Sequence, residues 1–313
     1  MVDKHSIERK VGSSPFKLTP LLDSFLRGHE GKWMGAHQLS IVTADQLGWL
    51  NGFAPTSRKQ VIKYAHALCE NGYLQMDSVL KRTRLRPGGG WDYKPVFYYA
   101  LAKEGAKYLK AKGYPIKDSF RDSKEIGRDP SHVLHTLELN NVLASAQQLQ
   151  EYSAFHRLAE FIHERDMARR GHSIMWHGQR LPVVPDALVI FHSITAEGKL
   201  RIVPLIIEHD TGSEYGEAIV RKIQAYAAIM TNHKFEEWFG IKGIRVGFTT
   251  FAGEKRREYL RRKTYELLQD MPHLRGSFLF TSQSPMPDPK HLWTETCWYT
   301  AADEKPIALL GEV

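Results

Sequence analysis

The sequence predicts an α+β protein of two domains, and three observations support this prediction. The chain has 313 residues, which is long enough for two domains that each bury a core. Residues 1–128 hold 22 Lys and Arg against 12 Asp and Glu, a net charge of +10, whereas residues 129–313 have a net charge of −2. Helical patterns and a basic hairpin fill the first part, and apolar strands alternate with helices in the second. We expect domains at 15–115 and 131–313, joined by a linker at 116–130.

The composition limits the class of protein. Charged residues make up 25% of the chain and hydrophobic residues 42%, the balance of a globular protein. The two cysteines, Cys69 and Cys297, form no CxxC motif and are too few for a disulfide framework. No apolar stretch reaches the length of a membrane span, and the polar start has no secretory signal pattern. We therefore expect a cytoplasmic protein without a membrane partner.

The first domain has the element order of a winged helix-turn-helix. Apolar spacing predicts helices at 18–29, 43–53 and 56–72, and a closing helix at 103–113. Period-two patterns predict strands at 73–86 and 94–102, joined by a glycine-rich tip. In a winged helix the third helix enters the major groove and the hairpin, or wing, contacts phosphates.

The positive charge of this domain predicts double-stranded DNA as its partner, because phosphate contacts dominate nucleic-acid affinity. The expected DNA-binding residues are Ser57, Arg58, Lys59 and Lys63 on the third helix, and Lys81, Arg82, Arg84 and Arg86 on the wing. A basic helix face that is only solvated is the alternative for the helix.

The sequence pattern of the second domain predicts the order helix, strand, strand, strand, helix, strand. The helices are expected at 131–150 and 213–230, with Ser131 and Ser213 as their N-caps. The strands are expected at 157–168, 181–191, 200–210 and 244–251.

Acidic residues lie inside the second of these strands and at the end of the third. Asp186 lies in the second strand, and Glu208 and Asp210 are two residues apart, so their side chains share one side of the third strand. Three such carboxylates suit Mg²⁺ or Mn²⁺. Lys222 falls on the apolar face of the next helix, where a lysine needs an anionic partner. The alternatives are a strand end that reaches solvent for the two acids and a lysine whose stem lies on the core for Lys222. We interpret His135 as a helix-surface residue.

These patterns resemble the PD-(D/E)xK nucleases and, over residues 15–282, the replication-relaxation family of bacterial plasmids and mobile elements. The similar segments are "HVLHTLELNNVLAS", "VPDALVIF", "IIEHDTGSEYGEAIVRKIQAY" and "FLFTS". The resemblance implies a winged helix followed by a restriction-endonuclease-like αβββαβ domain. It also implies that Asp186 and Glu208 bind metal and that Glu138 or Glu164 is an additional acid. Asp210 stands where the pattern has lysine, and Lys222 is similar to a lysine that has moved to the next helix.

The residues and the resemblance together predict a magnesium- or manganese-dependent DNA endonuclease in which Asp186, Glu208, Lys222 and Asp210 are catalytic. Asp186, Glu208 and Asp210 would bind the metal. Its setting would be replication or relaxation of a plasmid or mobile element. One alternative is a non-catalytic DNA-binding accessory protein with a degenerate nuclease fold. Another is a nuclease subunit that needs a replication, relaxase or recombinase partner. The sequence predicts neither the oligomeric state nor the DNA sequence bound.

Overall fold

The computed structural model describes residues 39–85, 91–114, 116, 120, 126–212, 216–286 and 288–311. The chain divides into two compact units, Met1–Arg128 and Asp129–Val313, and each unit is considered by itself. Several expected features lie outside the described part: the helix at 18–29, most of the linker, the hairpin tip, the side chain of Arg84, Arg86 and Ser213. Within the described residues, no helix combines the length and the apolar composition needed to cross a bilayer.

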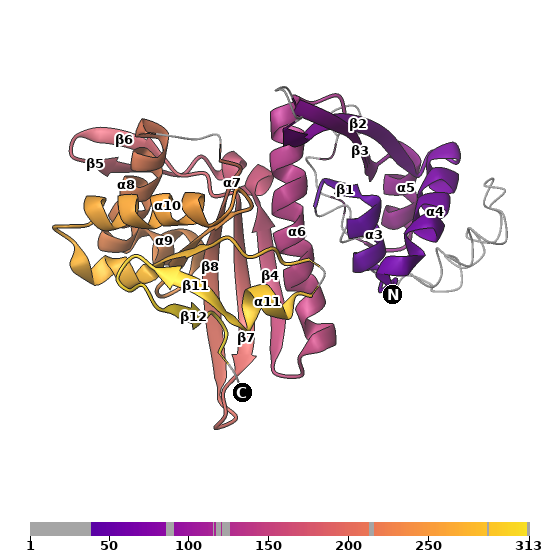
Figure 1. The fold of residues 1–313 in the computed structure, drawn as a ribbon. Coiled ribbons are helices and arrows are strands. Elements are labelled where there is room, and N and C mark those ends of the chain that lie inside the picture. The colour runs from indigo at the N-terminus through magenta and orange to yellow at the C-terminus, as the bar shows by residue number, and fades with distance from the viewer. Residues whose placement is uncertain are drawn as a thin grey trace, which may run out of the picture. The chain divides into compact units, whose positions relative to one another are not determined.

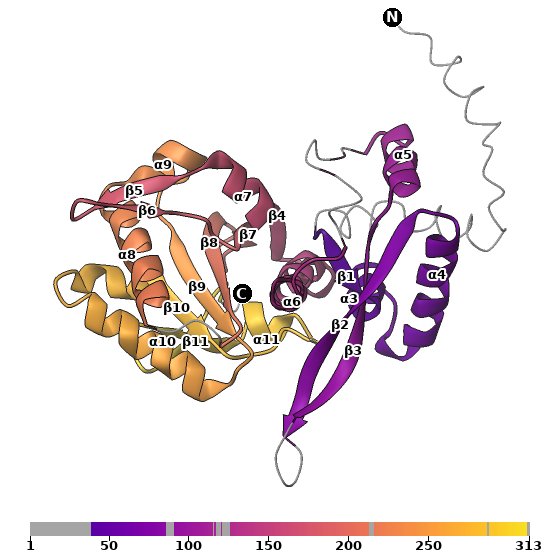
Figure 2. The same ribbon diagram turned by 90° about the horizontal axis from the view of Figure 1, so that it is seen from above.

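The first unit contains a three-stranded antiparallel sheet in the order β1-β3-β2, in which β2 and β3 form a long hairpin (Figure 2). Its described elements are β1 (Ile41–Thr43), α3 (Ala44–Leu50), the 3-10 helix η1 (Pro55–Ser57), α4 (Arg58–Glu70), β2 (Leu74–Leu85), β3 (Trp91–Leu101) and α5 (Lys103–Ala111). Strand β1 was not predicted, because three residues are too few to show an alternating pattern.

Local sequence explains where the helices of this unit begin and which side they bury. Thr43 caps α3 in a capping box: its hydroxyl accepts the Gln46 N–H at 3.2 Å, and Gln46 Oε1 accepts the Thr43 N–H at 2.8 Å. Helix α4 buries Val61, Ala65 and Leu68, the stripe expected from their spacing. The opposite side of α4 is therefore turned to solvent.

The second unit is built on a seven-stranded mixed sheet in the order β12-β11-β10-β9-β8-β7-β4. Its elements are α6 (Pro130–Tyr152), β4 (His156–His163), α7 (Glu164–Arg170), β5 (Ser173–Trp176), β6 (Gln179–Pro182), β7 (Ala187–Ile194), β8 (Leu200–Asp210), α8 (Glu217–Thr231), α9 (Lys234–Phe239), β9 (Arg245–Thr250), α10 (Glu254–Leu267), η3 (Pro272–Ser277), β10 (Phe278–Thr281), α11 (Lys290–Trp293), β11 (Thr296–Thr300) and β12 (Pro306–Ala308). Strands β4, β7 and β8 form an antiparallel meander, and β9 runs parallel to β8. The predicted helix–strand–strand–strand–helix–strand order is present as α6, β4, β7, β8, α8 and β9.

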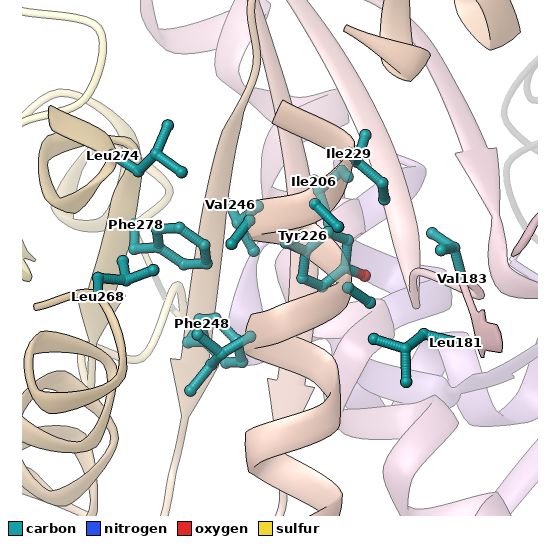
Figure 3. Packing of buried hydrophobic residues seen from close by; sticks show 14 of the residues in the cluster. Leu181, Val183, Ile206, Tyr226, Ile229, Val246, Phe248, Leu268, Leu274 and Phe278 are labelled. Carbon is teal, nitrogen blue, oxygen red and sulfur yellow. The ribbon is translucent and has the colours of Figure 1, made fainter. Parts of the chain in front are cut away.

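Helices cover both faces of this sheet (Figure 1). Helices α6 and α11 lie on one face, and α8 and α10 lie on the other. Between the sheet and α8, the strand residues Ile206, Val246 and Phe248 pack with Tyr226 and Ile229 in one buried cluster (Figure 3). Because side chains alternate along a strand, the even-numbered residues at the end of β8 face α8 and α10, whereas His209 faces α6.

The expected helix starts in this unit are wrong in detail. Asp129, not Ser131, caps α6: its carboxylate accepts the Ser131 N–H at 2.9 Å, and Pro130 takes the first helical position. Helix α8 begins at Glu217 with Gly216 as its N-cap, rather than at Ser213. An Asp before a proline is as good a cap as a serine after it, so the sequence pattern did not separate the two.

Two strand predictions also change. The apolar run 181–191 is divided, because its start belongs to β6 and Asp186 precedes β7. Pro185 lies in the gap, where it cannot donate a ladder hydrogen bond. Glu164 was expected on the first strand and instead begins α7. Helix α7 and the β5–β6 hairpin are therefore an insertion between the first and second strands of the meander.

Candidate active site

Three acidic residues lie side by side where β4, β7 and β8 meet one end of the sheet. The register pairs Ala187 of β7 with the last residue of β4 and with Ile207 of β8. The next residues in that row are Glu164, Asp186 and Glu208. The Glu164 N–H donates to the Asp186 carbonyl at 2.7 Å, which keeps the start of α7 beside β7. The fold thus brings together an acid of α7, the acid just before β7 and an acid of β8.

Asp186 and Glu164 form an acid–histidine cluster with His135 of α6. One ligand atom from each of these three residues lies within 4.8 Å of those of the other two. His135 Nε2 is 3.3 Å from Asp186 Oδ2 and 2.9 Å from the carbonyl oxygen of His209. An imidazole nitrogen and two carboxylates suit a first-row divalent cation such as Mn²⁺. The residues present therefore fit a metal, but the set differs from the one expected.

The charges of His135 and Asp186 depend on each other. Burial alone would lower the pKa of His135, but its hydrogen bond to Asp186 and the nearby carboxylates raise this pKa to about 9. Burial would likewise raise the pKa of Asp186, and His135, Lys222 and the His209 N–H together lower it. Without a cation, the two residues form an imidazolium–carboxylate pair. A metal bound to His135 would take the place of that proton.

Glu208 is buried next to this cluster and faces α8. Lys222 Nζ lies 2.9 Å from Glu208 Oε2, and the Tyr226 hydroxyl donates to Oε1. Burial raises the pKa of Glu208; Lys222 and Tyr226 oppose this rise, and the charge of Asp186 adds to it. The side chain of Lys222 is 30% exposed, so its ammonium lies between the buried carboxylate and solvent. The structure brings Lys222 to Glu208, as the apolar-face position suggested.

Asp210 has a different partner from the other two acids. Its Oδ2 is 2.7 Å from Arg256 Nε and its Oδ1 is 2.8 Å from Arg256 Nη2, a buried bidentate pair. Oδ2 also accepts the Gly212 N–H at 3.2 Å. Asp210 shares the α8 and α10 side of β8 with Glu208 but is directed to α10. Asp210 was expected to bind the metal, but this geometry does not support that role, because Arg256 pairs with both carboxylate oxygens of Asp210.

Of the two additional acids considered, the structure brings Glu164 and not Glu138 to Asp186. Glu138 Oε2 lies 3.3 Å from His209 Nε2, and His209 Nδ1 lies 3.0 Å from Thr249 Oγ1. The His209 N–H donates to Asp186 Oδ2 at 2.7 Å. Glu138 therefore holds the segment that supports Asp186 from the α6 side of the sheet.

The described residues of the expected DNA-binding surface are mostly exposed. Exposed side chains are those of Lys59, Lys63, Lys81 and Arg82. Arg58 is also exposed, but its Nε lies 2.7 Å from Asp45 Oδ1, so its charge is partly used within the unit. Ser57 is half-buried and precedes α4 without making a side-chain cap.

Sequence reasoning missed three residues of the site, and two of them left a signal. His135 lies three positions before Glu138 on α6, so both were available to the same face of the sheet. Tyr226 lies four positions after Lys222 and therefore shares its helix face. Arg256 left no signal in the sequence. Helix α10 is rich in arginine and lysine, and its sequence does not distinguish the arginine that points into the protein.

The family model described as replication-relaxation matches residues 39–241. The matched range contains the acid–histidine cluster, Glu208, Lys222 and Tyr226, and it ends before β9 begins. Comparison with curated proteins gave no match, and comparison with solved structures gave none.

Proposed function

The chain belongs to the replication-relaxation family, and on that basis we propose that it is a DNA-binding, divalent-metal-dependent phosphodiesterase. It would nick or cut DNA in the replication or relaxation of a plasmid or mobile element. The observation that carries the proposed chemistry is the acid–histidine cluster, with Lys222 held beside it by Glu208.

The topology around the cluster supports this proposal. The order α6, β4, β7, β8, α8, β9 is the αβββαβ order of the PD-(D/E)xK nucleases. Asp186 and Glu208 would correspond to the two acids in that pattern. Asp210 stands where the pattern has lysine, and Lys222 supplies an ammonium to the same carboxylate from the following helix.

Each residue has a role that follows from its position. A divalent ion held by His135, Glu164 and Asp186 would polarise a phosphate oxygen and lower the pKa of a water molecule. Lys222, partly exposed, would stabilise negative charge that develops on the phosphate. Tyr226 engages one oxygen of Glu208, so the other oxygen remains to position Lys222.

The first unit would bind the DNA. Its sheet order β1-β3-β2, with α3 and α4 preceding the hairpin, supports the winged-helix interpretation. Helix α4 would then enter the major groove with Lys59 and Lys63, and β2 would contact phosphates through Lys81 and Arg82.

We expect replacement of Lys59, Lys63, Lys81 and Arg82 together by alanine in the full chain to weaken duplex binding. The slope of log K against log salt should flatten by about 0.9 for each phosphate that is no longer neutralised. Fluorescence anisotropy at several salt concentrations measures both effects. A control with Lys290→Ala and Lys305→Ala, two exposed residues of the second unit, should keep the wild-type slope. An unchanged slope in the fourfold variant would show that this face does not bind DNA.

Nicking of supercoiled plasmid by the full chain tests the proposed activity. We expect conversion to the open circle with Mn²⁺ or Mg²⁺ and none with a chelator. The extent of nicking, read from a gel, should follow the metal concentration. Absence of metal-dependent nicking would contradict the activity of the isolated protein.

A specific observation favours a second function, that of a non-catalytic DNA-binding accessory protein. Asp186 and Glu208 already have partners within the protein: His135 and the His209 N–H for the first, Lys222 and Tyr226 for the second. Each of the two carboxylates thus lies beside a basic group of the protein itself. A chain that binds DNA but neither binds Mn²⁺ nor nicks would have this function. A chain that binds Mn²⁺ without nicking would instead be a subunit that needs a replication, relaxase or recombinase partner.

A further inference from the structure

The insertion between β4 and β7 carries a local surplus of positive charge. Residues 164–186 contain four arginines and three acids, and two of these acids, Glu164 and Asp186, belong to the acid–histidine cluster at the ends of the insertion. The unit from residue 129 to the end of the chain has a net charge of −2. Three of these arginines, Arg169, Arg170 and Arg180, are exposed. We call them the arginine surface.

The arginine surface is anchored to the fold through groups other than carboxylates. Arg180 Nε donates to Ser173 Oγ at 2.8 Å, and the guanidinium of Arg170 lies over the Phe239 ring at 5.3 Å. His172 stacks on Trp238 with ring centroids 4.3 Å apart, which ties the turn after α7 to α9. Within the described part of the chain, no carboxylate forms an ion pair with any of the three arginines. Their charges are therefore available to an anionic partner.

This surface lies at the end of the sheet that carries the acid–histidine cluster. Helix α7 starts at Glu164, a member of the cluster, and rises by about 1.5 Å per residue toward Arg169 and Arg170. The β5–β6 hairpin packs against α8, the helix of Lys222. Figure 1 shows α7 and this hairpin beyond the end of β7 and β8. The arginines thus lie on an insertion that begins at Glu164 of the cluster and packs on the helix of Lys222.

We propose that the arginine surface binds the phosphate backbone of the DNA segment that enters the acid–histidine cluster. The inference rests on the proposed function, and it assigns to the second unit a DNA contact separate from α4 and the wing. Arginine is suited to this role because its guanidinium pairs with phosphate through two parallel hydrogen bonds. Excess positive charge beside acidic residues that need a metal would draw the backbone to the site without neutralising those acids.

Photo-crosslinking of the full chain to duplex DNA tests this inference. Met175, 60% exposed on β5, would be replaced by p-benzoylphenylalanine as the reactive residue. Phe155, 46% exposed just before β4 and at the opposite end of the sheet, would carry the same group as a matched control. We expect a crosslink from position 175 and little from position 155.

Charge variants then test the role of the arginines. Changing Arg169, Arg170 and Arg180 together to alanine should reduce the crosslink from position 175 by about tenfold, since alanine cannot bind phosphate. Changing the same three residues to lysine should retain most of it, which separates loss of charge from loss of folding. Replacing Lys199, Lys290 and Lys305 by alanine removes equal charge elsewhere and should leave the yield unchanged.

The outcomes separate this inference from the proposed function. A crosslink that needs the arginines supports the surface even if the chain does not nick plasmid. Metal-dependent nicking without any crosslink from position 175, or with a crosslink that survives the alanine changes, would overturn the surface while leaving the activity in place.

Discussion

Replacing Asp186 by asparagine is expected to remove Mn²⁺ binding and plasmid nicking together, with little change in DNA affinity. Asparagine has nearly the same shape but lacks the negative charge of a metal ligand, and Asp186 is central to the acid–histidine cluster. The loss should exceed the roughly 10- to 100-fold effect of removing a group outside the ligand set. DNA affinity should persist because α4 and the wing belong to the other unit.

Thermal unfolding gives a second measurement of the same change. At Mn²⁺ about 100-fold above its Kd, binding stabilises the wild type by about 2.7 kcal/mol, and Asp186→Asn should lose this gain. In the absence of metal, Asp186→Asn should also melt lower than wild type. Clustered acids by themselves would give the opposite result, because the substitution would relieve repulsion between like charges. His135 and the His209 N–H reverse that result, because both lie against the charged carboxylate, and hydrogen bonds to a charged group contribute about 1.5–3 kcal/mol, more than hydrogen bonds to a neutral amide oxygen.

Two control variants make this result specific. Asp270→Asn removes the same charge from an exposed position and should leave Mn²⁺ binding, nicking and melting temperature unchanged. Lys222→Ala should slow nicking by about 100-fold or more while Mn²⁺ still raises the melting temperature, because its proposed partner is the phosphate. An Asp186→Asn protein that nicks DNA and is stabilised by Mn²⁺ like the wild type would show that the cluster is not the metal site.

Arg256→Ala is expected to destabilise the second unit by about 3–5 kcal/mol, because it leaves a buried carboxylate without its partner. Arg256 and Asp210 are almost fully buried, with side-chain exposures of 6% and 4%. Arg256 supplies two of the hydrogen bonds to the carboxylate, and its guanidinium lies over the Tyr259 ring at 5.0 Å. Urea unfolding followed by circular dichroism measures the change.

The double variant Arg256→Met/Asp210→Leu removes both charges and should recover most of the stability, since apolar residues of similar volume replace a buried ion pair at little cost. It should also keep its Mn²⁺ response, which separates Asp210 from the metal site. Arg262→Ala on the same helix breaks only an exposed contact with Glu266 at 3.8 Å and should cost less than about 1 kcal/mol. A loss of stability from Arg256→Ala no larger than that from Arg262→Ala would mean that the buried pair contributes little.

Local patterns predicted most of the elements that position the site. The spacing in 200–210 predicted β8 with its observed bounds, and the order of the second domain matched α6, β4, β7, β8, α8 and β9. Periodicity also placed Lys222 on the inner face of α8. The insertion of α7 and β5–β6 was not predicted, because each of its elements is short. In addition, the end of β6, the segment with Pro185 and the start of β7 form one apolar run that resembles a single strand.

The charge asymmetry of the two parts, the order of the main elements and the acids at the end of β8 could all be read from the linear sequence. Each of these features depends on residues close together in the chain, so the hydrophobic period and the local composition are sufficient to predict it. Which acids share a site depends instead on the tertiary structure. His135 meets the His209 carbonyl 74 positions away, and Asp210 meets Arg256 46 positions away. Those pairings follow from how α6 and α10 pack on opposite faces of the sheet. Asp210 is therefore neutralised by Arg256, whereas Glu208 is held by Lys222 and Asp186 lies beside Glu164 and His135.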